Sequence, residues 1–293
     1  MKIYINHQLY KSWVVDESVI TYSEFQDSKI GRDENYNGYN NFFKGVITDF
    51  RIARTALTPD KFLPLDQPGI TLYGKTMLEG PFFGGEMTPW LNAQGHIPLT
   101  QPYSNAPWFY SGNETVPAIP NSDVVDWILI ELRESTGNAS SAIEDSIITC
   151  RAGFILKNGD IVDLDGFRQI QFDIEVENNL YLVLRHRNHL NIISATPLTS
   201  SNGSVYTYDF TTDPQMALGG TSAQKELSPG IWGMIAGDAD GNGQIDNLDK
   251  NDIWYDEYSS TGYYRGDLNM NSQVADNDKI LWMPNGGKGT RVP

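Results

Sequence analysis

The 293-residue sequence has a single cysteine and only 21 Lys and Arg residues against 37 Asp and Glu. One cysteine cannot form an internal disulfide, so we interpret Cys150, which lies in a strand-like run, as a small core residue rather than a nucleophile. The net charge of −16 argues against nucleic acid and against an anionic membrane surface as partners.

Other absences concern membranes and catalysis. No apolar run approaches the length of a membrane span, and the first residues alternate like a strand instead of forming the apolar region of a signal peptide. The motifs Gly-x-Ser-x-Gly and His-Glu-x-x-His and a phosphate loop are all missing. We therefore expect no membrane insertion and no catalysis by this chain, although its many carboxylates leave a glycosidase pair open.

Acidic residues are concentrated near the end of the sequence. Residues 237–278 contain ten acids and two bases, a net charge of −8. Within them, oxygen-bearing side chains fall at positions 1, 3, 5, 9 and 12 of a twelve-residue loop, and Gly243 stands at position 6, where such a loop turns sharply. A hard cation of the size of Ca²⁺ needs six to eight oxygen ligands. The expected ligands of this first calcium site are Asp238, Asp240, Asn242, Gln244 through its backbone carbonyl, Asp246 and Asp249.

A second loop repeats this spacing 29 positions later. It departs from the first at two positions: Ser272 replaces the turn glycine, and Ala275 removes the ligand at position 9. We expect weaker calcium binding here, because the loop offers two carboxylates instead of four. For the first loop, the alternative is a turn rich in Asp, Asn and Gly that only resembles a calcium site. The expected ligands of the second site are Asp267, Asn269, Asn271, Gln273 and Asp278.

A duplicated EF-hand-like calcium loop with Asp at position 12 resembles a dockerin repeat, over residues 236–286. The resemblance implies that each loop leads into one helix, that Ile245 at position 8 points toward a paired loop, and that the two halves pack together. It also implies a cohesin partner, which members of that family contact through loop positions 10 and 11, often with small hydroxyl residues. Those positions here hold Asn247-Leu248 and Asp276-Asn277.

The middle of the chain, residues 71–232, is expected to form an antiparallel β-sandwich. Residues 126–133 read as a largely buried strand, and Asn158-Gly159 predicts a type I′ hairpin turn. Further alternating runs over 170–176, 180–187 and 205–210 complete a set of short strands separated by turns. Residues 98–103, 124–133 and 184–190 resemble a module of large secreted bacterial proteins, some with haemagglutinin-type names.

The first 63 residues resemble the last third of a laminin-G-like, concanavalin-A-type jelly roll. The resemblance rests on four elements in order: Gly31-Arg32, Phe43-Lys44-Gly45, Asp49-Phe50-Arg51 and Ala56-Leu57-Thr58-Pro59. It implies that earlier strands of that fold are missing and that the sequence is the C-terminal part of a longer protein. Residues 64–70 are expected to be a linker, and residues 287–293 a tail. The overall expectation is a mainly β chain ending in a small helical calcium-binding pair.

Some side chains outside the calcium loops are candidates for binding a ligand. Tyr103, Trp108 and Tyr110 lie in a loop rich in Pro, Gly and Asn, where aromatic faces could stack on sugar rings or pin the loop to its own sheet. His186 shares the apolar face of its expected strand, which favours a hydrogen-bonded core histidine over a zinc ligand. For Arg185 and Arg187 we favour pairing with nearby acids over binding an acidic sugar.

Together these features suggest a non-catalytic, calcium-binding C-terminal part of a secreted or cell-surface modular protein, used for adhesion or carbohydrate contact. The sequence leaves two alternatives. The chain is either the ancillary tail of a polysaccharide-degrading enzyme, or a true dockerin that binds a cohesin-bearing scaffold protein.

Overall fold

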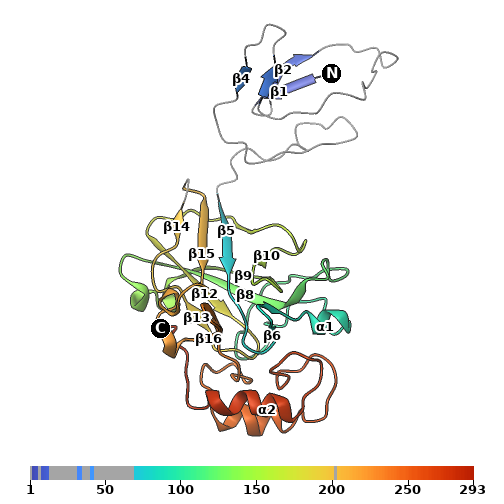
Figure 1. Cartoon of the computed structure of the whole chain (residues 1–293). Helices are drawn as coiled ribbons and strands as arrows, with labels where there is room; N and C mark the ends of the chain where they lie inside the picture. Colours follow the sequence, from blue (N-terminus) through green and yellow to red (C-terminus); the bar gives the residue numbers. More distant parts are fainter. Residues whose placement is uncertain (1, 6–7, 13–31, 35–39, 43–68, 201–202) are drawn as a thin grey trace, which may run out of the picture. The chain divides into compact units, whose positions relative to one another are not determined.

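The chain folds into two compact units, Met1–Gln67 and Pro68–Pro293, which Figure 1 shows in a computed structural model. The structure describes residues 2–5, 8–12, 32–34, 40–42, 69–200 and 203–293. The chain is mainly β, with several sheets and few helices. Each unit is described separately below.

In the first unit, two antiparallel pairs of short strands are described. Strand β1 (Lys2–Ile5) pairs with β2 (Gln8–Ser12), as expected from the alternation at the start of the sequence, and β3 (Arg32–Glu34) pairs with β4 (Asn40–Phe42). Most of the motifs that resemble a jelly roll lie outside the described residues, as does most of the expected linker 64–70. The last residue of that linker, Ile70, already belongs to the first strand of the second unit.

The larger sheet of the second unit has five strands in the order β10-β9-β8-β12-β13, all paired antiparallel. Its central strand β8 is buried over its first ten residues, because the sheet is covered on both faces. This agrees with the largely buried strand expected at 126–133. The strands are β8 (Val124–Ser135), β9 (Ile147–Leu156), β10 (Ile161–Val162), β12 (Asn179–Arg185) and β13 (Ile192–Ile193).

A second sheet has four strands in the order β11-β5-β15-β14. Its central pair, β5 and β15, runs parallel, so the expectation of a purely antiparallel arrangement is wrong for this sheet. The two strands lie about 130 residues apart in the chain, and alternation within each strand carries no information on the direction of its partner. The strands are β5 (Ile70–Lys75), β11 (Ile170–Phe172), β14 (Thr199–Ser200) and β15 (Val205–Asp209).

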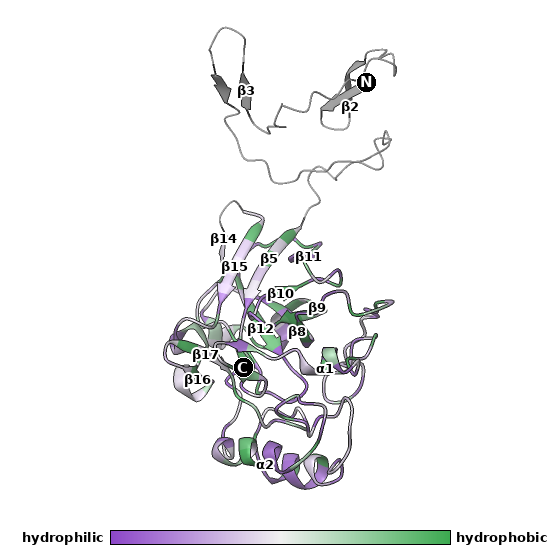
Figure 2. Cartoon of the chain, turned by 45° about the vertical axis from the view of Figure 1, so that its right-hand side comes forward, coloured by the Kyte–Doolittle hydropathy of each residue, from purple (hydrophilic) through white to green (hydrophobic). Residues whose placement is uncertain are grey.

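One large cluster of buried apolar side chains contains residues of both sheets. Leu72 of β5 and Tyr208 of β15 belong to it, together with Trp127 of β8 and Phe154 of β9, whose ring centroids lie 4.2 Å apart. Figure 2 shows hydrophobic residues gathered along the strands and hydrophilic ones along the C-terminal helix. The apolar faces of the two sheets therefore share one core.

The hairpin between β9 and β10 forms at Asn158-Gly159, but not with the type I′ turn expected there. Of the two residues, only Gly159 has a positive φ, of 88°. The backbone N–H of Gly159 donates to the carbonyl of Leu156, and the N–H of Leu156 donates to the carbonyl of Asp160. This pattern is a type I turn followed by a left-handed glycine, the usual three-residue hairpin loop.

Small elements surround the sheets, and the described helices are short. None of them is both long and apolar enough to cross a membrane. Two short strand pairs are β6 (Phe82–Phe83) with β7 (Glu86–Met87), and β16 (Gln224–Ser228) with β17 (Ile231–Met234). The helical elements are α1 (Trp90–Ala93), η3 (Ala139–Ser141), η4 (Glu144–Ser146), η5 (Pro214–Met216), η6 (Gly220–Ser222), the π-helical η7 (Asp249–Trp254), α2 (Asp276–Trp282) and η8 (Met283–Asn285).

Candidate calcium loops

Loop 1, residues 238–249, curls around its own acidic side chains and leads into η7. The carboxylate of Asp249 at position 12 accepts from the backbone N–H of Asp240 at 3.1 Å and of Asp246 at 2.8 Å. The carboxylate of Asp238 at position 1 accepts from the N–H of Gly243 at 3.1 Å. Two further bonds join residues two positions apart, from the N–H of Asn242 to the side chain of Asp240 and from the N–H of Gln244 to the side chain of Asn242.

Loop 2, residues 267–278, leads into α2 and repeats all five of these bonds at equivalent positions. Asp278 at position 12 accepts from the N–H of Asn269 at 3.0 Å and of Ala275 at 2.8 Å. Asp267 at position 1 accepts from the N–H of Ser272 at 2.8 Å. The other two bonds run from the N–H of Asn271 to Asn269 and from the N–H of Gln273 to Asn271. The two loops therefore have one hydrogen-bonding scheme.

The turn at position 6 takes a left-handed backbone in both loops. Gly243 has φ of 86° and Ser272 has φ of 75°. Glycine adopts this region freely, whereas for a residue with a Cβ this conformation costs free energy. The Ser272 hydroxyl oxygen is also buried without a hydrogen-bond partner. Loop 2 thus keeps the turn in spite of its residue at this position.

The carboxylates at positions 1 and 12 are buried in both loops, since Asp238, Asp249, Asp267 and Asp278 are each at most 1% exposed. Burial raises the pKa of Asp249, Asp267 and Asp278 to about 6, and it raises that of Asp238 well above its usual value. Backbone N–H groups lower these pKa values again without cancelling the effect of burial. Four buried acids held only by N–H donors are costly to ionise, and a bound cation would reverse that cost.

The ligand set of loop 1 fits a hard divalent cation. One carboxylate oxygen from each of Asp238, Asp240 and Asp249 lies within 4.8 Å of the others. The side chains at the ligand positions of both loops offer oxygen and no sulfur or imidazole, which is the preference of Ca²⁺ rather than Zn²⁺. Of the expected ligands, Asp246 is exposed, and its Oδ1 accepts from the N–H of Leu248.

Each loop pairs with a segment that follows the helix of the other repeat, here called a return segment. Return segment 1, residues 259–262, hydrogen-bonds loop 2. The bonds run from Ser259 N to Val274 O (2.9 Å), from Val274 N to Ser260 O (3.0 Å) and from Gly262 N to Ser272 O (2.9 Å).

Return segment 2, residues 287–290, makes the matching bonds to loop 1. They run from Gly287 N to Ile245 O (2.7 Å), from Ile245 N to Lys288 O (2.8 Å) and from Thr290 N to Gly243 O (2.8 Å). Among the described residues, Ile245 and Val274 at position 8 have no backbone bond to each other, and each bonds a return segment. Ile245 packs instead with Leu190, Ile235 and Trp282.

The helical parts exchange contacts in the same reciprocal way. The ammonium of Lys250 in repeat 1 lies 5.4 Å from the ring centroid of Trp282 in repeat 2, and that of Lys279 lies 5.3 Å from the ring of Trp254. The indole N–H of Trp254 donates to the carbonyl of Ala275 at position 9 of loop 2. Each half of the duplicated segment is therefore completed by residues of the other half.

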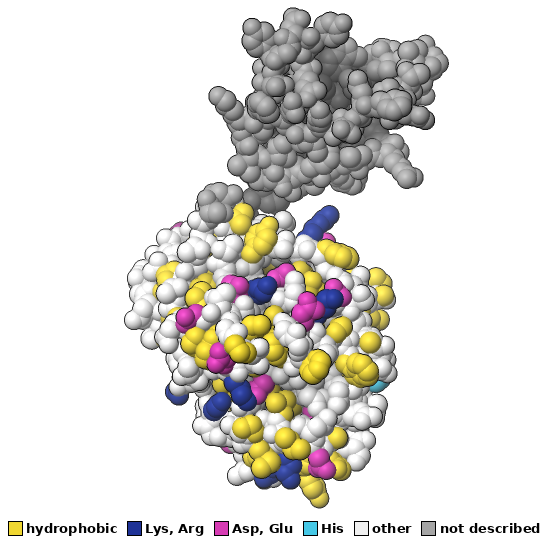
Figure 3. Space-filling view, in the orientation of Figure 1, with side chains coloured by type: hydrophobic (Ala, Val, Ile, Leu, Met, Phe, Trp, Pro, Cys, Tyr) yellow, Lys and Arg dark blue, Asp and Glu magenta, His cyan; other side chains and the backbone are white. Residues whose placement is uncertain are grey.

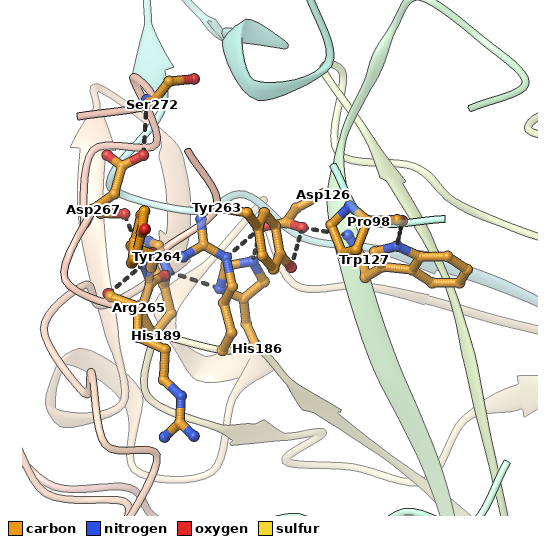
Figure 4. A network of polar contacts seen from close by, with 12 residues as sticks. Pro98, Asp126, Trp127, His186, His189, Tyr263, Tyr264, Arg265, Asp267 and Ser272 are labelled. Carbon is orange, nitrogen blue, oxygen red and sulfur yellow. Dashed lines mark hydrogen bonds and ion pairs between the residues drawn. The ribbon is translucent and has the colours of Figure 1, made fainter. Parts of the chain in front are cut away.

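A buried polar network fastens loop 2 to the five-stranded sheet (Figure 4). Asn188, just after β12, donates through Nδ2 to the carbonyls of Asp267 at 2.8 Å and Arg265 at 3.1 Å. Arg187 donates to the carbonyl of Tyr264 and, at 2.8 Å, to the carboxylate of Asp126 on β8. We call these two residues the loop 2 anchor.

Asp126 balances the charge of this network. It accepts from the Tyr263 hydroxyl at 2.7 Å and lies against Arg187, whose guanidinium also stacks 4.3 Å from the Tyr263 ring centroid. Burial alone would raise the pKa of Asp126, but Arg187 and His186 lower it to about 2. As favoured from the sequence, Arg187 and also Arg185, 2.9 Å from Glu131, form ion pairs with buried acids.

Two buried histidines support the anchor from behind. Nδ1 of His189 lies 2.8 Å from Oδ1 of Asn188, and its Nε2 accepts from the N–H of Gly80 at 3.1 Å. Nε2 of His186 lies 3.3 Å from the Asp126 carboxylate but lacks hydrogen-bond geometry. Burial lowers the pKa of His186 and lowers that of His189 well below its usual value, so both rings are neutral near pH 7.

Of the two interpretations of the aromatic loop, its contacts favour the one in which it is pinned to its own sheet. Tyr103 is fully buried and donates to the carbonyl of Trp127, so its ring is out of reach of a ligand. Tyr110 is half-buried and donates to Glu114 at 2.5 Å. Trp108 packs edge-on against Tyr103 and approaches loop 1 so closely that a Cβ on Gly241 would lie 2.9 Å from its ring.

Arg265 ties this aromatic loop to loop 1. Its guanidinium donates to the carbonyls of Asp240 at 3.2 Å and Ala106 at 3.1 Å, and lies 5.2 Å from the Trp108 ring centroid. The contacts lie far apart in sequence, so alternation and composition could not have revealed them.

Comparisons with known proteins assign no family. No protein-family model and no curated protein matches the chain. Similar solved chains come from mutants of a type II cohesin–X–dockerin complex of Acetivibrio cellulolyticus. An N-terminal interface mutant is 12% identical with a TM-score of 0.32, covering 56% of this chain and 82% of that one. A C-terminal interface mutant is 12% identical with a TM-score of 0.36, covering 76% and 98%. These TM-scores are too low for either likeness to carry an argument.

Proposed function

We propose that the chain is a non-catalytic, calcium-binding part of a secreted or cell-surface modular protein, used for adhesion or carbohydrate contact. The observation that carries the calcium proposal is the identical hydrogen-bonding scheme of two loops whose carboxylates at positions 1 and 12 are buried without a cationic side chain bonded to them. Buried carboxylates of this kind are retained where a metal ion compensates them.

In this proposal, loop 1 holds calcium through Asp238, Asp240, Asn242, Asp246 and Asp249 with the carbonyl of Gln244. Loop 2 holds it more weakly through Asp267, Asn269, Asn271 and Asp278 with the carbonyl of Gln273. A bound ion supplies charge that offsets the acidic repulsion within residues 237–278. The chain's own residues supply the frame: N–H donors fix both carboxylates at positions 1 and 12, and the exchanged return segments hold each loop closed.

The function is proposed to be structural and adhesive because nothing in the described residues resembles a reaction centre. The buried titratable groups outside the loops, such as Asp126 with Arg187 and Glu131 with Arg133, are paired in the interior rather than exposed in a cleft. Extracellular calcium modules work at millimolar calcium, which suits loop 2 with its two carboxylates.

The calcium proposal is tested by calorimetric titration of the full chain with Ca²⁺. We expect two binding events that differ in affinity, an Asp238→Asn variant that loses the tighter event and an Asp267→Asn variant that loses the weaker one. Asp252→Asn is the matched control, because Asp252 is an exposed acid of η7 outside the ligand positions. Absence of heat change and of stabilisation up to millimolar Ca²⁺ contradicts the proposal.

A dockerin-like role is the second candidate, because apolar side chains on the calcium segment are exposed. Leu248 is 49%, Ile280 67% and Met283 62% exposed. Beside them, a groove of about 270 Å³ is lined by aromatic and lysine side chains, and Figure 3 shows Lys and Arg together with hydrophobic side chains at the end of the unit where α2 lies. The groove residues are Lys250, Asn251, Trp254, Tyr255, Tyr258 and Lys279.

Pull-down with a panel of purified cohesin modules in calcium tests this second candidate. We expect a bound cohesin to be released by Ile280→Asp and by chelator, but not by Phe83→Asp, which alters an even more exposed apolar residue on β6. Failure of every cohesin to bind, with calcium binding intact, removes the dockerin role and leaves the adhesive one.

A further inference from the structure

A cleft of about 580 Å³ opens on the four-stranded sheet, away from the calcium loops. Its size is within the range of small-ligand sites, roughly 300–1,000 Å³. Strands β5, β15 and β14 contribute to its wall, together with residues beside β10 and β11. Every lining residue belongs to the second unit, so the cleft is complete within one compact body.

Two rows of side chains cross these strands in register. In the first, Tyr73 of β5 is the partner of Thr207 on β15, which is in turn the partner of Thr199 on β14. The row thus places an aromatic ring, 45% exposed, beside two hydroxyl groups 3.3 Å apart. An aromatic face next to hydroxyl donors and acceptors is suited to a ring with an apolar face and polar edges.

The second row lies two residues further along β5 and β15 and carries one cation between two acids. Lys75 is the cross-strand partner of Asp209 on one side and of Asp160 on the other, with its ammonium 3.6 Å from the Asp160 carboxylate. The only cation lining the cleft is therefore already flanked by acids. An anionic ligand would meet two carboxylates here, whereas a neutral one would not be repelled.

Hydrogen-bonding capacity remains free along this cleft. Oδ1 of Asp209 accepts from the backbone N–H and the hydroxyl of Thr211, and within the described part of the chain neither its Oδ2 nor the half-buried Gln169 amide makes a hydrogen bond. Amide and carboxylate groups spaced around an aromatic ring can bond the hydroxyls of a ligand in defined positions.

We propose that this cleft binds a neutral oligosaccharide, with the Tyr73 ring stacked on one sugar and Asp209, Thr207 and Gln169 bonding its hydroxyls. The inference rests on the carbohydrate-contact part of the proposed function and moves it from the aromatic loop at Tyr103 to the sheet. It is independent of the calcium sites, because none of the residues that line the cleft belongs to either loop.

The test screens the full chain in calcium against a printed array of neutral and acidic oligosaccharides, followed by calorimetry with the strongest neutral binder. We expect Tyr73→Ala to weaken this binder by about tenfold or more, the effect of losing one aromatic contact, and Tyr73→Phe to retain it. The matched control is Phe83→Ala, which removes a more exposed aromatic side chain on β6, outside the cleft. Thr207→Arg, at an exposed position, should block the cleft without disturbing the core.

The outcomes separate this inference from the proposed function. A neutral glycan whose binding is unchanged in Tyr73→Ala and Thr207→Arg, with both variants folded by melting temperature, overturns the cleft assignment and leaves carbohydrate contact standing. Binding of acidic glycans alone also overturns it. If no glycan binds, the cleft and the carbohydrate part of the proposed function both fail, while calcium binding is judged by its own titration.

Discussion

The two calcium loops have the same backbone hydrogen bonds but differ in charge, turn residue and attachment. Loop 1 has four carboxylates at its ligand positions and a glycine at the turn, and loop 2 has two carboxylates and Ser272. Loop 2 differs also in being held by side chains of the anchor, because Asn188 and Arg187 bond the carbonyls of Asp267, Arg265 and Tyr264 at and just before its start. At loop 1, Asn188 contributes only its backbone carbonyl, which accepts from the N–H of Gly237 at 3.0 Å. A Cβ on Gly80 would even lie 1.9 Å from the carbonyl oxygen of Leu268.

The two loops therefore depend on different features for calcium binding. Loop 1 relies on ligand charge, which gives affinity but leaves strong repulsion without metal. Loop 2 relies on the sheet to hold its shape, which lowers the entropy lost on binding. We infer that loop 2 keeps its shape in the absence of calcium and that loop 1 needs the metal more.

The largest effect is expected on removal of the metal or of a position-12 ligand. In chelator, loop 1 should lose protection from amide hydrogen exchange before loop 2 does, since the anchor side chains bond carbonyls at and just before the start of loop 2 and none of loop 1. In calcium, Asp249→Ala should weaken the tighter site by roughly a hundredfold, because affinity follows the number of charged ligands. Asp278→Ala should remove only the weaker site. Equal exchange in both loops without calcium would refute the comparison.

A second, smaller effect is expected from removing return segment 2, which follows the helix of repeat 2 and pairs with loop 1. Truncation after Gly286 removes the strand that closes loop 1 but leaves residues 259–262 on loop 2. We expect loop 1 to lose calcium affinity by about tenfold, as when a supporting contact around a metal site is removed. Truncation after Thr290 is the control, since it keeps all three bonds to loop 1. Calorimetry that finds both truncations equivalent would show that the exchange is not needed for binding.

The sequence predicted the bounds of the loops and the sharp turn at position 6, but not the segments that support them. Side chains at positions 1, 3, 5 and 12 bond N–H groups within the same twelve residues, so spacing alone anticipates where they converge. The Asn188 anchor joins residues 79 positions apart, and Tyr263 reaches Asp126 across 137. Pairing of this length leaves no periodic signal in a single sequence.

The same reasoning explains the errors elsewhere. The apolar run over 126–133 and the run over 180–187 identified β8 and β12 as strands. Alternation could not distinguish the parallel β15 from an antiparallel strand, nor show that Tyr103 points inward to the carbonyl of Trp127. The return segments pair through backbone atoms only, so no residue type marks them as partners of the loops.

An exchange of the position-6 residues should give an effect of intermediate size. Ser272→Gly removes the cost of a left-handed backbone and a buried hydroxyl without a partner, so we expect about 1 kcal/mol of added stability. Gly243→Ser should destabilise by more, because a Cβ there also lies 2.8 Å from Cγ2 of Thr290 on the return segment. Denaturant unfolding in calcium measures both. Destabilisation by Ser272→Gly together with stabilisation by Gly243→Ser would mean that the turn residue does not distinguish the loops.

The smallest effect is expected from pH, through the histidines behind the loop 2 anchor. The pKa of buried His189 is well below the unfolded value near 6.5, so its neutral ring stabilises the fold above that pH, and the contribution is lost as pH falls. His186, Arg187 and Asp126 face the same interior, and a proton on Nε2 of His189 would meet the N–H of Gly80.

In saturating calcium, which keeps the loop carboxylates ionised, stability should therefore decrease between pH 7 and pH 5.5. A His189→Gln variant should be less stable at pH 7 but lose less stability between pH 7 and pH 5.5. Its loop 2 should bind calcium more weakly than loop 2 of the wild type at both pH values. Thermal unfolding of the two proteins across this range, with Tyr255→Ala as the surface control, measures the difference. An identical pH dependence of wild type and variant would show that His189 does not support the anchor.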